Sequence, residues 1–455
     1  MSETAKLTRG SIRGHLVSQT LPNILGVAAL MSVALLNAYY IGRLGSAQLA
    51  AVAFIFPVVI AVSSLGVGVM VGINSVIARS LGAGDVEQAA RRANFGAVFA
   101  LATGAVLGLA LYLLIDPLFR LMQADSALRP LIREFMAPYA LGLPLLLLQM
   151  ALNGVLRGQG EARMNSLISL AYAAINWVLN PFLITGALGI GGLGLAGAAY
   201  AMLAGYGFAC LLALWFIART HLPINPALIR QCRMGESARA IMRVAGPAAL
   251  SNAINPVGLA VLTGLLASEG QAAVAGFGAA GRLQSFAVVP LLALSGSIGA
   301  IVGQNWGAGE HDRARLALFE AGLFCLAYGL GTGALLWLFG DWFGGVFSSD
   351  PALIEAFSTY LAISVWGYAG FGLLIVANGA LNAVDRSAYA LAQSFARVFF
   401  LMLPFAWLLR GTWGADAIYG AELVANLGGG IVAAFVAWRV LAAPPRPALS
   451  GASGR

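Results

Sequence analysis

The chain has 455 residues, of which 60% are hydrophobic and only 10% are charged, and its mean hydropathy is +0.85. A water-soluble domain carries about 25% charged residues, so this composition excludes a protein that covers its own surface in water. A formal net charge of +8 is also found in nucleic-acid-binding proteins. Here, however, the charged residues fall mostly in the turns between apolar segments, which argues against a nucleic-acid partner.

Apolar segments long enough to cross a bilayer recur along the whole chain. A transmembrane helix needs about 20 predominantly apolar residues. Twelve segments meet this requirement, at residues 16–40, 47–76, 93–115, 132–156, 165–187, 192–217, 240–267, 272–302, 316–340, 356–381, 388–410 and 415–438. Backbone groups in lipid must be hydrogen-bonded within their own segment, and the alternation typical of barrel strands is missing, so each segment is predicted to be a helix.

The Lys and Arg residues predict the orientation of these helices. With the N-terminus inside, the predicted outer loops hold only five basic residues: Arg43, Arg120, Arg129, Arg133 and Arg410. The predicted inner loops and ends hold most of the others. This bias follows the positive-inside rule, so we expect a multi-pass protein of the cytoplasmic (inner) membrane with both termini in the cytoplasm. The lipid bilayer is therefore an expected partner, and nucleic acid is not.

Composition along the chain predicts two helical lobes. Residues 1–15 are expected to be a cytoplasmic N-terminal arm, residues 16–218 the N-lobe, and residues 219–238 a polar cytoplasmic linker. Residues 239–440 are expected to form the C-lobe. Residues 441–455, which are rich in Pro, Ser and Gly, are predicted to be a disordered cytoplasmic tail.

The two predicted lobes carry an internal repeat. The run Gly82-Ala83-Gly84-Asp85 recurs 225 residues later as Gly307-Ala308-Gly309-Glu310, and near the ends of the lobes the offset becomes 223. Each lobe has six spans, an even number, so both lobes have the same orientation and their pseudo-two-fold axis lies along the membrane normal. We therefore expect an all-α membrane protein of twelve transmembrane helices in two six-helix, parallel-repeat lobes around a central cleft. This design suits transport by alternating access.

The repeated motifs resemble those of the multidrug and toxic compound extrusion (MATE) family over nearly the whole chain. The matching stretches are Leu81 to Asp85, its counterpart Ile301 to Glu310, Asn153-Gly154 with Leu156-Arg157, and Asn176 with Pro181. The resemblance implies a secondary transporter that exports small amphipathic, often cationic organic compounds by H⁺- or Na⁺-coupled antiport. Apart from this coupling ion no cofactor is expected. A monomer without enzyme activity is also expected.

Two acidic positions of the family pattern carry amides in this chain. Near the end of the first helix the chain reads Leu36-Asn37, and in the fifth helix it has Asn180 before Pro181, where the family usually has Asp. An amide does not titrate near neutral pH, so neither side chain can exchange a proton, although its carbonyl could ligate Na⁺. Two alternatives stay open for Asn37, Asn176 and Asn180: they line the pathway, or they bond between helices. The other uncharged residues expected along the pathway are Tyr40, Asn255 and Asn378.

Three ionisable residues lie deep within the predicted spans, away from the span ends. Arg282 and Arg397 fall in the eighth and eleventh spans, where a charge costs roughly 2.5–3.5 kcal/mol on the insertion scale. Such a cost predicts that each faces inward and has a partner. Glu422, in the twelfth span, is either an ion-coupling carboxylate or a solvated residue at the outer interface, and Arg397 is a candidate partner for it.

Two other functions are weighed against antiport. A lipid or lipid-linked precursor flippase of the same superfamily would have a more cationic central cavity, and Arg282 and Arg397 give it slight support. A polytopic membrane enzyme would need clustered catalytic residues at a membrane face. The three histidines, His15, His221 and His311, are dispersed, so this alternative is the more distant one.

Overall fold

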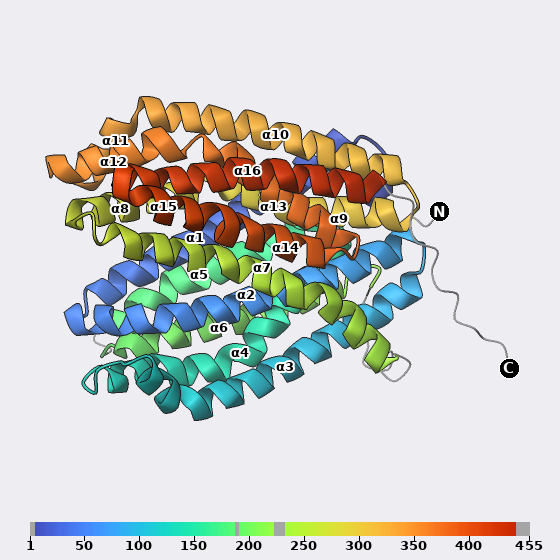
Figure 1. Cartoon of the computed structure of the whole chain (residues 1–455). Coiled ribbons are helices and arrows are strands. Elements are labelled where there is room, and N and C mark those ends of the chain that lie inside the picture. Colours follow the sequence, from blue (N-terminus) through green and yellow to red (C-terminus); the bar gives the residue numbers. More distant parts are fainter. Residues whose placement is uncertain (1–4, 187–190, 223–232, 443–455) are drawn as a thin grey trace.

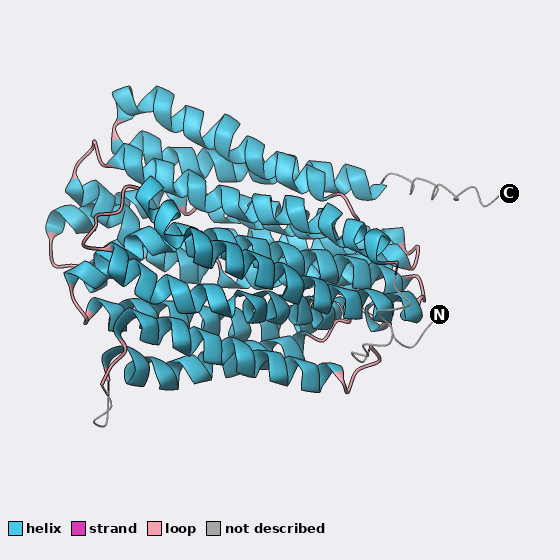
Figure 2. Cartoon of the chain, turned by 90° about the horizontal axis from the view of Figure 1, so that it is seen from below, coloured by secondary structure: helices cyan, strands magenta, loops and turns pink. Residues whose placement is uncertain are grey.

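The computed structural model describes residues 5–186, 191–222 and 233–442. These residues form helices joined by turns, and within these ranges no strand occurs (Figure 2). The first half of the chain and the second half pack side by side as two lobes, and the loops gather at the two ends of the bundle (Figure 1). Both ends of the described chain lie at the same end of the bundle.

Six spans build the N-lobe, preceded by a 3-10 turn, η1 (Lys6–Thr8). The spans are α1 (Ile12–Gly42), α2 (Ser46–Gly82), α3 (Val86–Leu121), α4 (Arg129–Gly158), α5 (Ala162–Asn180) with its π-helical extension η2 (Pro181–Thr185), and α6 (Gly194–Ile217). All six are long and apolar enough to cross a membrane, as the sequence predicted.

The C-lobe is built from more helices because several of its spans are interrupted. In chain order they are α7 (Met234–Leu266), α8 (Gln271–Ala287), α9 (Val289–Gly307), α10 (His311–Leu338), α11 (Gly340–Phe347), α12 (Pro351–Ser364), α13 (Gly367–Ala383), α14 (Ser387–Ala396), the π-helical η4 (Arg397–Met402), α15 (Leu403–Trp413) and α16 (Ala415–Ala442). If each bent pair is one span, the described residues hold twelve spans, the predicted number.

Two predicted C-lobe spans, the eighth and the tenth, are broken rather than continuous. The eighth bends by 44° between α8 and α9, and the tenth bends by 57° between α12 and α13. Pro290 in the first turn of α9 lacks the N–H that a continuous helix would need, and Gly367 begins α13. Their N-lobe counterparts, α2 and α4, are unbroken although both contain Pro.

The boundaries of the predicted arm, linker and tail fall partly outside the described residues. In the arm, α1 begins at Ile12 and Leu7 is buried. Helix α7 begins at Met234, so it includes the end of the predicted linker, of which residues 223–232 are not described. Helix α16 extends to Ala442, and the rest of the predicted tail is not described.

Small residues bring the two lobes together. Helix α2 packs against α7, and α1 and α2 pack against α9. A Cβ atom at Gly68 would lie 2.4 Å from the carbonyl oxygen of Ala245, and one at Gly72 would lie 2.8 Å from that of Ile241. Glycine therefore lets α2 and α7 approach at backbone distance, as small residues do between membrane helices.

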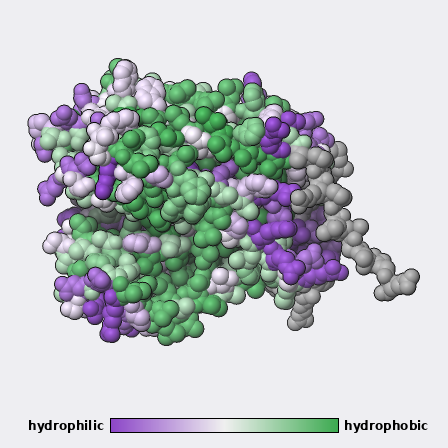
Figure 3. Space-filling view, viewed as in Figure 1, coloured by the Kyte–Doolittle hydropathy of each residue, from purple (hydrophilic) through white to green (hydrophobic). Residues whose placement is uncertain are grey.

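The outer surface of the bundle is apolar around its middle. Hydrophobic residues form a belt in the space-filling view, and hydrophilic residues gather at the two ends (Figure 3). Large side chains such as Val106, Leu211, Phe400 and Trp407 are more than 60% exposed. Such a surface is unsuited to water and fits a hydrocarbon environment.

Candidate functional site

The lobes meet at one end of the bundle and separate at the other. Helix α9 packs against α1, α2 and α4 of the N-lobe, whereas α8, the other half of the same span, packs mainly against α7, α9 and α12 of its own lobe. The surface is hollowed between the lobes at the end opposite the termini (Figure 3). The cleft therefore opens away from the cytoplasm, and the cytoplasmic end is closed.

Two glycine turns form the centre of this closure. A Cβ atom at Gly82 would lie 2.1 Å from the carbonyl oxygen of Gln304, and one at Gly307 would lie 2.2 Å from that of Arg79. Because Gln304 follows Arg79, and Gly307 follows Gly82, by the same 225 residues, the two contacts are related by the internal repeat. The repeated glycines are thus explained by a close approach of the two lobes.

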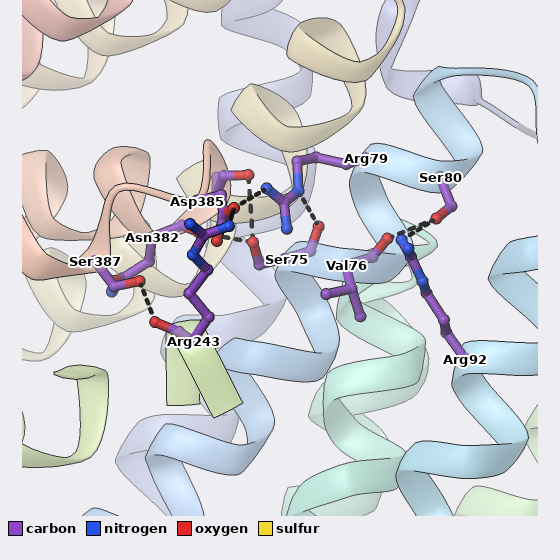
Figure 4. A network of polar contacts seen from close by, with 10 residues as sticks. Ser75, Val76, Arg79, Ser80, Arg92, Arg243, Asn382, Asp385 and Ser387 are labelled. Atoms are coloured by element: carbon purple, nitrogen blue, oxygen red, sulfur yellow. Dashed lines mark hydrogen bonds and ion pairs between the residues drawn. The ribbon is translucent and has the colours of Figure 1, made fainter. Parts of the chain in front are cut away.

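An ion-pair network lies beside the glycine contact (Figure 4). The Asp385 Oδ2 atom, in the turn between α13 and α14, lies 3.7 Å from Arg79 Nη1 on α2 and 3.3 Å from Arg243 Nη1 on α7. The Ser75 hydroxyl donates a hydrogen bond to the Asn382 carbonyl oxygen at 2.6 Å. Arg79 and Ser75 belong to the N-lobe and the others to the C-lobe, so this network joins the lobes.

Asp385 adopts a backbone conformation that favours glycine. Its φ is +62°, and Gly160, 225 residues earlier, has a φ of +76°. This left-handed region costs most non-glycine residues roughly 1–2 kcal/mol, and Asp, like Asn, less than most. The C-lobe therefore carries an acid, at a conformational cost, where the N-lobe keeps the residue that suits the turn.

A basic cavity of about 340 Å³ opens beside this network. Its lining residues are Arg79, Arg92, Glu236, Arg239, Ala240, Arg243 and Asp385. Four arginines against two acids give these residues a net charge of +2. The cavity would attract anionic molecules from the cytoplasm.

The N-terminal arm ties the lobes together on the same side. The Leu7 backbone N–H donates to Gln304 Oε1 at 3.1 Å, and Asn305 Nδ2 donates to the Leu7 carbonyl oxygen at 3.1 Å. Lys6 forms an ion pair of 2.6 Å with Glu161 in the turn between α4 and α5. The arm thus contacts α9 of the C-lobe and a turn of the N-lobe at once.

The predicted N-lobe amides lie between α1 and α5. Asn180 Nδ2 donates to Asn37 Oδ1 at 2.6 Å, and Asn176 Nδ2 donates to the Tyr172 carbonyl oxygen at 2.9 Å. The Oδ1 atoms of Asn176 and Asn180 are buried without a hydrogen-bond partner among the described residues. Asn37 and Asn180 therefore bond between helices, and their role along a pathway stays a prediction. The half-buried Tyr40 ring lies edge-on to that of Tyr39.

Glu422 lies in a polar cluster within the C-lobe. Its Oε1 accepts a hydrogen bond of 2.6 Å from Gln284 Nε2, and the Tyr360 hydroxyl lies 2.7 Å from its Oε2. The same hydroxyl lies 2.8 Å from Gln284 Oε1. Glu422 is only 4% exposed, so the alternative that it is solvated at the outer interface is wrong.

Arg397 is buried, but its partners are amides. Its guanidinium donates to the Oδ1 atoms of Asn255 on α7 and Asn426 on α16, and its Nε has no partner among the described residues. None of the ion pairs in the described part of the chain joins it to Glu422, so the predicted ion pair is not formed. Asn426, one turn beyond Glu422 on α16, accepts a hydrogen bond from the guanidinium instead.

Arg282 is exposed, and the prediction that it has a partner is wrong. Within the described ranges it has no hydrogen bond or ion pair, because the surrounding face of α8 is open. Cβ atoms at Gly278 and Gly281 would meet no atom within 4 Å. The place of Arg282 along the pathway stays a prediction.

Asn378 joins neighbouring helices of the C-lobe. Its Nδ2 donates to the Ser394 hydroxyl at 3.0 Å, and its Oδ1 accepts from Gln393 Nε2 at 2.5 Å. The Ser251 hydroxyl lies 2.7 Å from the Ser394 hydroxyl. Ser251 is on α7, one turn before Asn255. The predicted residues Asn255, Asn378 and Arg397 thus share one polar region between α7, α13, α14 and η4.

Sequence reasoning missed Gln284 and Tyr360, and it gave Asp385 no role beyond that of a solvated acid near the inner face. Gln284 and Tyr360 are uncharged residues in apolar spans, and they gave no signal without a known partner. Asp385 did leave a signal, because the repeat pairs it with Gly160.

The described residues thus hold up to twelve spans in two parallel lobes around a cleft that is closed at one end, which is the architecture of a polytopic membrane transporter built from parallel repeats. The MatE family model matches residues 22–182 and 247–408, so the chain belongs to the MATE family, whose members are transporters and not enzymes. It is accordingly a multi-pass protein of the inner membrane with both termini in the cytoplasm.

Individual relatives cover nearly the whole chain. A FAD transporter of Shewanella oneidensis is 33% identical over 440 residues, 97% of each chain. A probable multidrug resistance protein of Bacillus subtilis, YpnP, is 27% identical over 90% of this chain and 91% of its own. A crystal structure of an Asp-to-Asn variant of the Vibrio cholerae MATE transporter VcmN aligns with a TM-score of 0.89 and 26% identity, over 96% of this chain and 98% of that one.

Proposed function

We propose that the protein exports small amphipathic organic molecules by antiport with H⁺ or Na⁺, as a monomer whose two lobes open the cleft alternately to each side. The observation that carries this proposal is the asymmetric closure: the lobes are sealed at the cytoplasmic end and apart at the other. The seal contains partly exposed ion pairs such as Arg79–Asp385. Such pairs contribute about 0–1 kcal/mol each, so they can be broken in every cycle.

The charges of the cleft favour one substrate class over another. The family resemblance led us to expect cationic compounds, and YpnP is named as a multidrug resistance protein. However, Asn37 and Asn180 carry no charge, Arg282 is exposed, and the acid Glu422 is buried. These features support an anionic amphiphile, and FAD, which the Shewanella oneidensis relative is named for, is an anionic molecule of this class.

Transport into inside-out vesicles tests the proposal. We expect vesicles with the protein to accumulate FAD when a pH or Na⁺ gradient is imposed, and to accumulate the cationic dye ethidium less well. Arg282→Gln should raise the KM for FAD roughly tenfold, because it removes one charge-assisted contact. Arg410→Gln, an exposed arginine in the last turn of α15, is the matched control and should leave KM unchanged.

Three other outcomes would contradict parts of the proposal. Better uptake of ethidium than of FAD would restore the cationic class. Gradient-independent movement of a fluorescent lipid, without uptake of either solute, would favour the flippase. No uptake under either gradient would reject antiport of these compounds.

A further inference from the structure

We propose that the coupling ion is H⁺ and that Glu422, with Gln284 and Tyr360, forms the site that carries it. This inference rests on the proposed antiport and decides between the two ions that it leaves open. The three side chains come from α16, α8 and α12, so the site joins three different spans of the C-lobe.

A count of donors and acceptors shows that the cluster lacks one hydrogen when Glu422 is ionised. The Tyr360 hydroxyl lies 2.7 Å from Glu422 Oε2 and 2.8 Å from Gln284 Oε1, yet it has a single hydrogen for these two acceptors. A proton on Glu422 Oε2 supplies the missing donor. Glu422 then donates to Tyr360, Tyr360 donates to Gln284, and Gln284 Nε2 donates to Glu422 Oε1, which closes a ring in which every contact is satisfied.

The same count holds if the Gln284 amide is turned over. In that orientation its oxygen faces Glu422 Oε1 at 2.6 Å, and two acceptors at this distance require a hydrogen between them. The amide nitrogen would then donate to Tyr360, and Tyr360 would donate to Glu422 Oε2. Either orientation therefore requires one proton on the Glu422 carboxyl group.

The geometry is unsuited to Na⁺. The three contacts of the ring are 2.6 Å, 2.7 Å and 2.8 Å, which are hydrogen-bond distances, so no metal ion fits between the paired atoms. Glu422 is 4% exposed and Tyr360 is fully buried, whereas Gln284 is half-buried. A proton needs no coordination shell and can occupy such a site.

The site is built at the two broken spans. Gln284 lies four residues before Val288, where α8 gives way to α9, and its carbonyl oxygen accepts the Val288 N–H. Tyr360 lies four residues before Ser364, the end of α12, and the Ser364 hydroxyl donates to its carbonyl oxygen. Discontinuous helices are where transporters commonly place their ion sites.

The internal repeat shows that the site belongs to the C-lobe alone. The residues at the corresponding N-lobe positions are Val59 for Gln284, Phe135 for Tyr360 and Ala199 for Glu422. The N-lobe spans that carry the first two, α2 and α4, are continuous. The lobe with amides at its family acids thus has no equivalent of this cluster.

Arg397 can couple the loss of the Glu422 proton to a change at the interface between the two lobes. The titratable groups near Glu422 are Tyr360 on α12, Tyr368 on α13 and Arg397 on η4. When the Glu422 O–H bond breaks, its electron pair stays on the carboxylate and the proton passes to water in the cleft. The new negative charge attracts Arg397, whose Nε has no partner, away from Asn255 on α7. Since α7 packs against α2 across the lobes, this change reaches their interface.

Two measurements on the full-length protein test the site. In vesicles, FAD uptake should respond to a pH gradient and not to a Na⁺ gradient at constant pH. Glu422→Gln, which keeps a donor at this position, should lose the pH response but keep the gradient-free exchange of labelled for unlabelled FAD. In purified protein, infrared difference spectra across a pH titration should show a protonated carboxylic acid that Glu422→Gln removes. Asp341→Asn, an exposed acid in α11, is the control and should change neither result.

The two readouts separate failure of the site from failure of the proposed function. A normal pH response in Glu422→Gln, or FAD uptake driven by Na⁺ alone, would overturn the proton site. If the wild-type protein moves no FAD at all, the proposed substrate fails, and the infrared band still decides whether Glu422 holds a proton. Absence of that band in wild-type protein would reject the site.

Discussion

The hydrogen bond between Asn37 and Asn180 joins two positions at which the family pattern led us to expect acids. Asn37→Asp keeps the oxygen that accepts from Asn180 Nδ2 and adds a titratable charge. We therefore expect the variant to fold and to gain a second pH- or Na⁺-dependent step, measured as a change in the ion dependence of FAD uptake.

A matched substitution separates charge from hydrogen bonding. Asn37→Ala removes the acceptor and should cost about 1 kcal/mol of stability without adding an ion response. If Asn37→Asp and Asn37→Ala had the same ion dependence, the N-lobe pair would have no latent coupling role.

Asp385 combines an unfavourable backbone conformation with two arginine contacts. Asn tolerates the left-handed region, so Asp385→Asn should lose the ion pairs and keep the turn. Asp385→Gly loses the same pairs but relieves roughly 1 kcal/mol of strain. Both variants should open the cytoplasmic end, which hydrogen exchange at residues 79–84 would detect.

The melting temperature distinguishes the two variants. Asp385→Asn should melt below the wild-type protein, and Asp385→Gly should melt above Asp385→Asn. Unchanged hydrogen exchange in both variants would show that Asp385 does not hold the lobes together.

At the level of elements, hydropathy was sufficient to predict every span and insufficient to predict where two of them break. The eighth and tenth spans are apolar on both sides of the bends at Val288 and Val365, so a hydropathy pattern continues across them. Pro57 and Pro138 lie inside unbroken N-lobe helices, so Pro290 alone could not have shown which helix would break. The break depends on the neighbouring helices that satisfy the freed backbone groups.

The glycine turns at the ends of α2 and α9 allow a test of close packing. Gly82→Ala would place a Cβ atom 2.1 Å from the Gln304 carbonyl oxygen, so the helix ends must separate. We expect faster hydrogen exchange at residues 304–309 and a lower rate of FAD export. Gly84→Ala is the control: it meets no atom within 4 Å but is strained at a φ of +79°. Equal effects of both substitutions would indicate backbone strain rather than contact between the lobes.

For the whole molecule, the N-terminal arm is predicted to stabilise the closed cytoplasmic end. Leu7 is 1% exposed, and Leu7→Ala should cost about 2–3 kcal/mol, mainly in the state in which the arm is docked. The expected result is a lower melting temperature and faster hydrogen exchange near Gln304 and Asn305.

A neighbouring residue provides the control for the arm. Lys6→Gln removes only a partly exposed ion pair with Glu161, so it should have an effect below about 1 kcal/mol. If both variants left hydrogen exchange unchanged, the arm would not contribute to closure.

The candidate site was less predictable than the fold. The cost of a charge in lipid was enough to single out Arg397 and Glu422, which are both buried. It did not predict their partners, because Asn426, Gln284 and Tyr360 are uncharged and only their positions in space give them a role.

The reciprocal contact of the glycine turns has the geometry of an isologous dimer interface. Arg79 of one half meets Gly307 of the other, as Gln304 meets Gly82. A six-helix chain that carried this motif once could have made the same contact with a second copy of itself about a true two-fold axis. After fusion of two such copies, the two glycine turns in contact must remain alike, whereas the interiors of the two halves are free to differ. The turns of this chain have remained alike, whereas Glu422 has Ala199 as its counterpart in the other half.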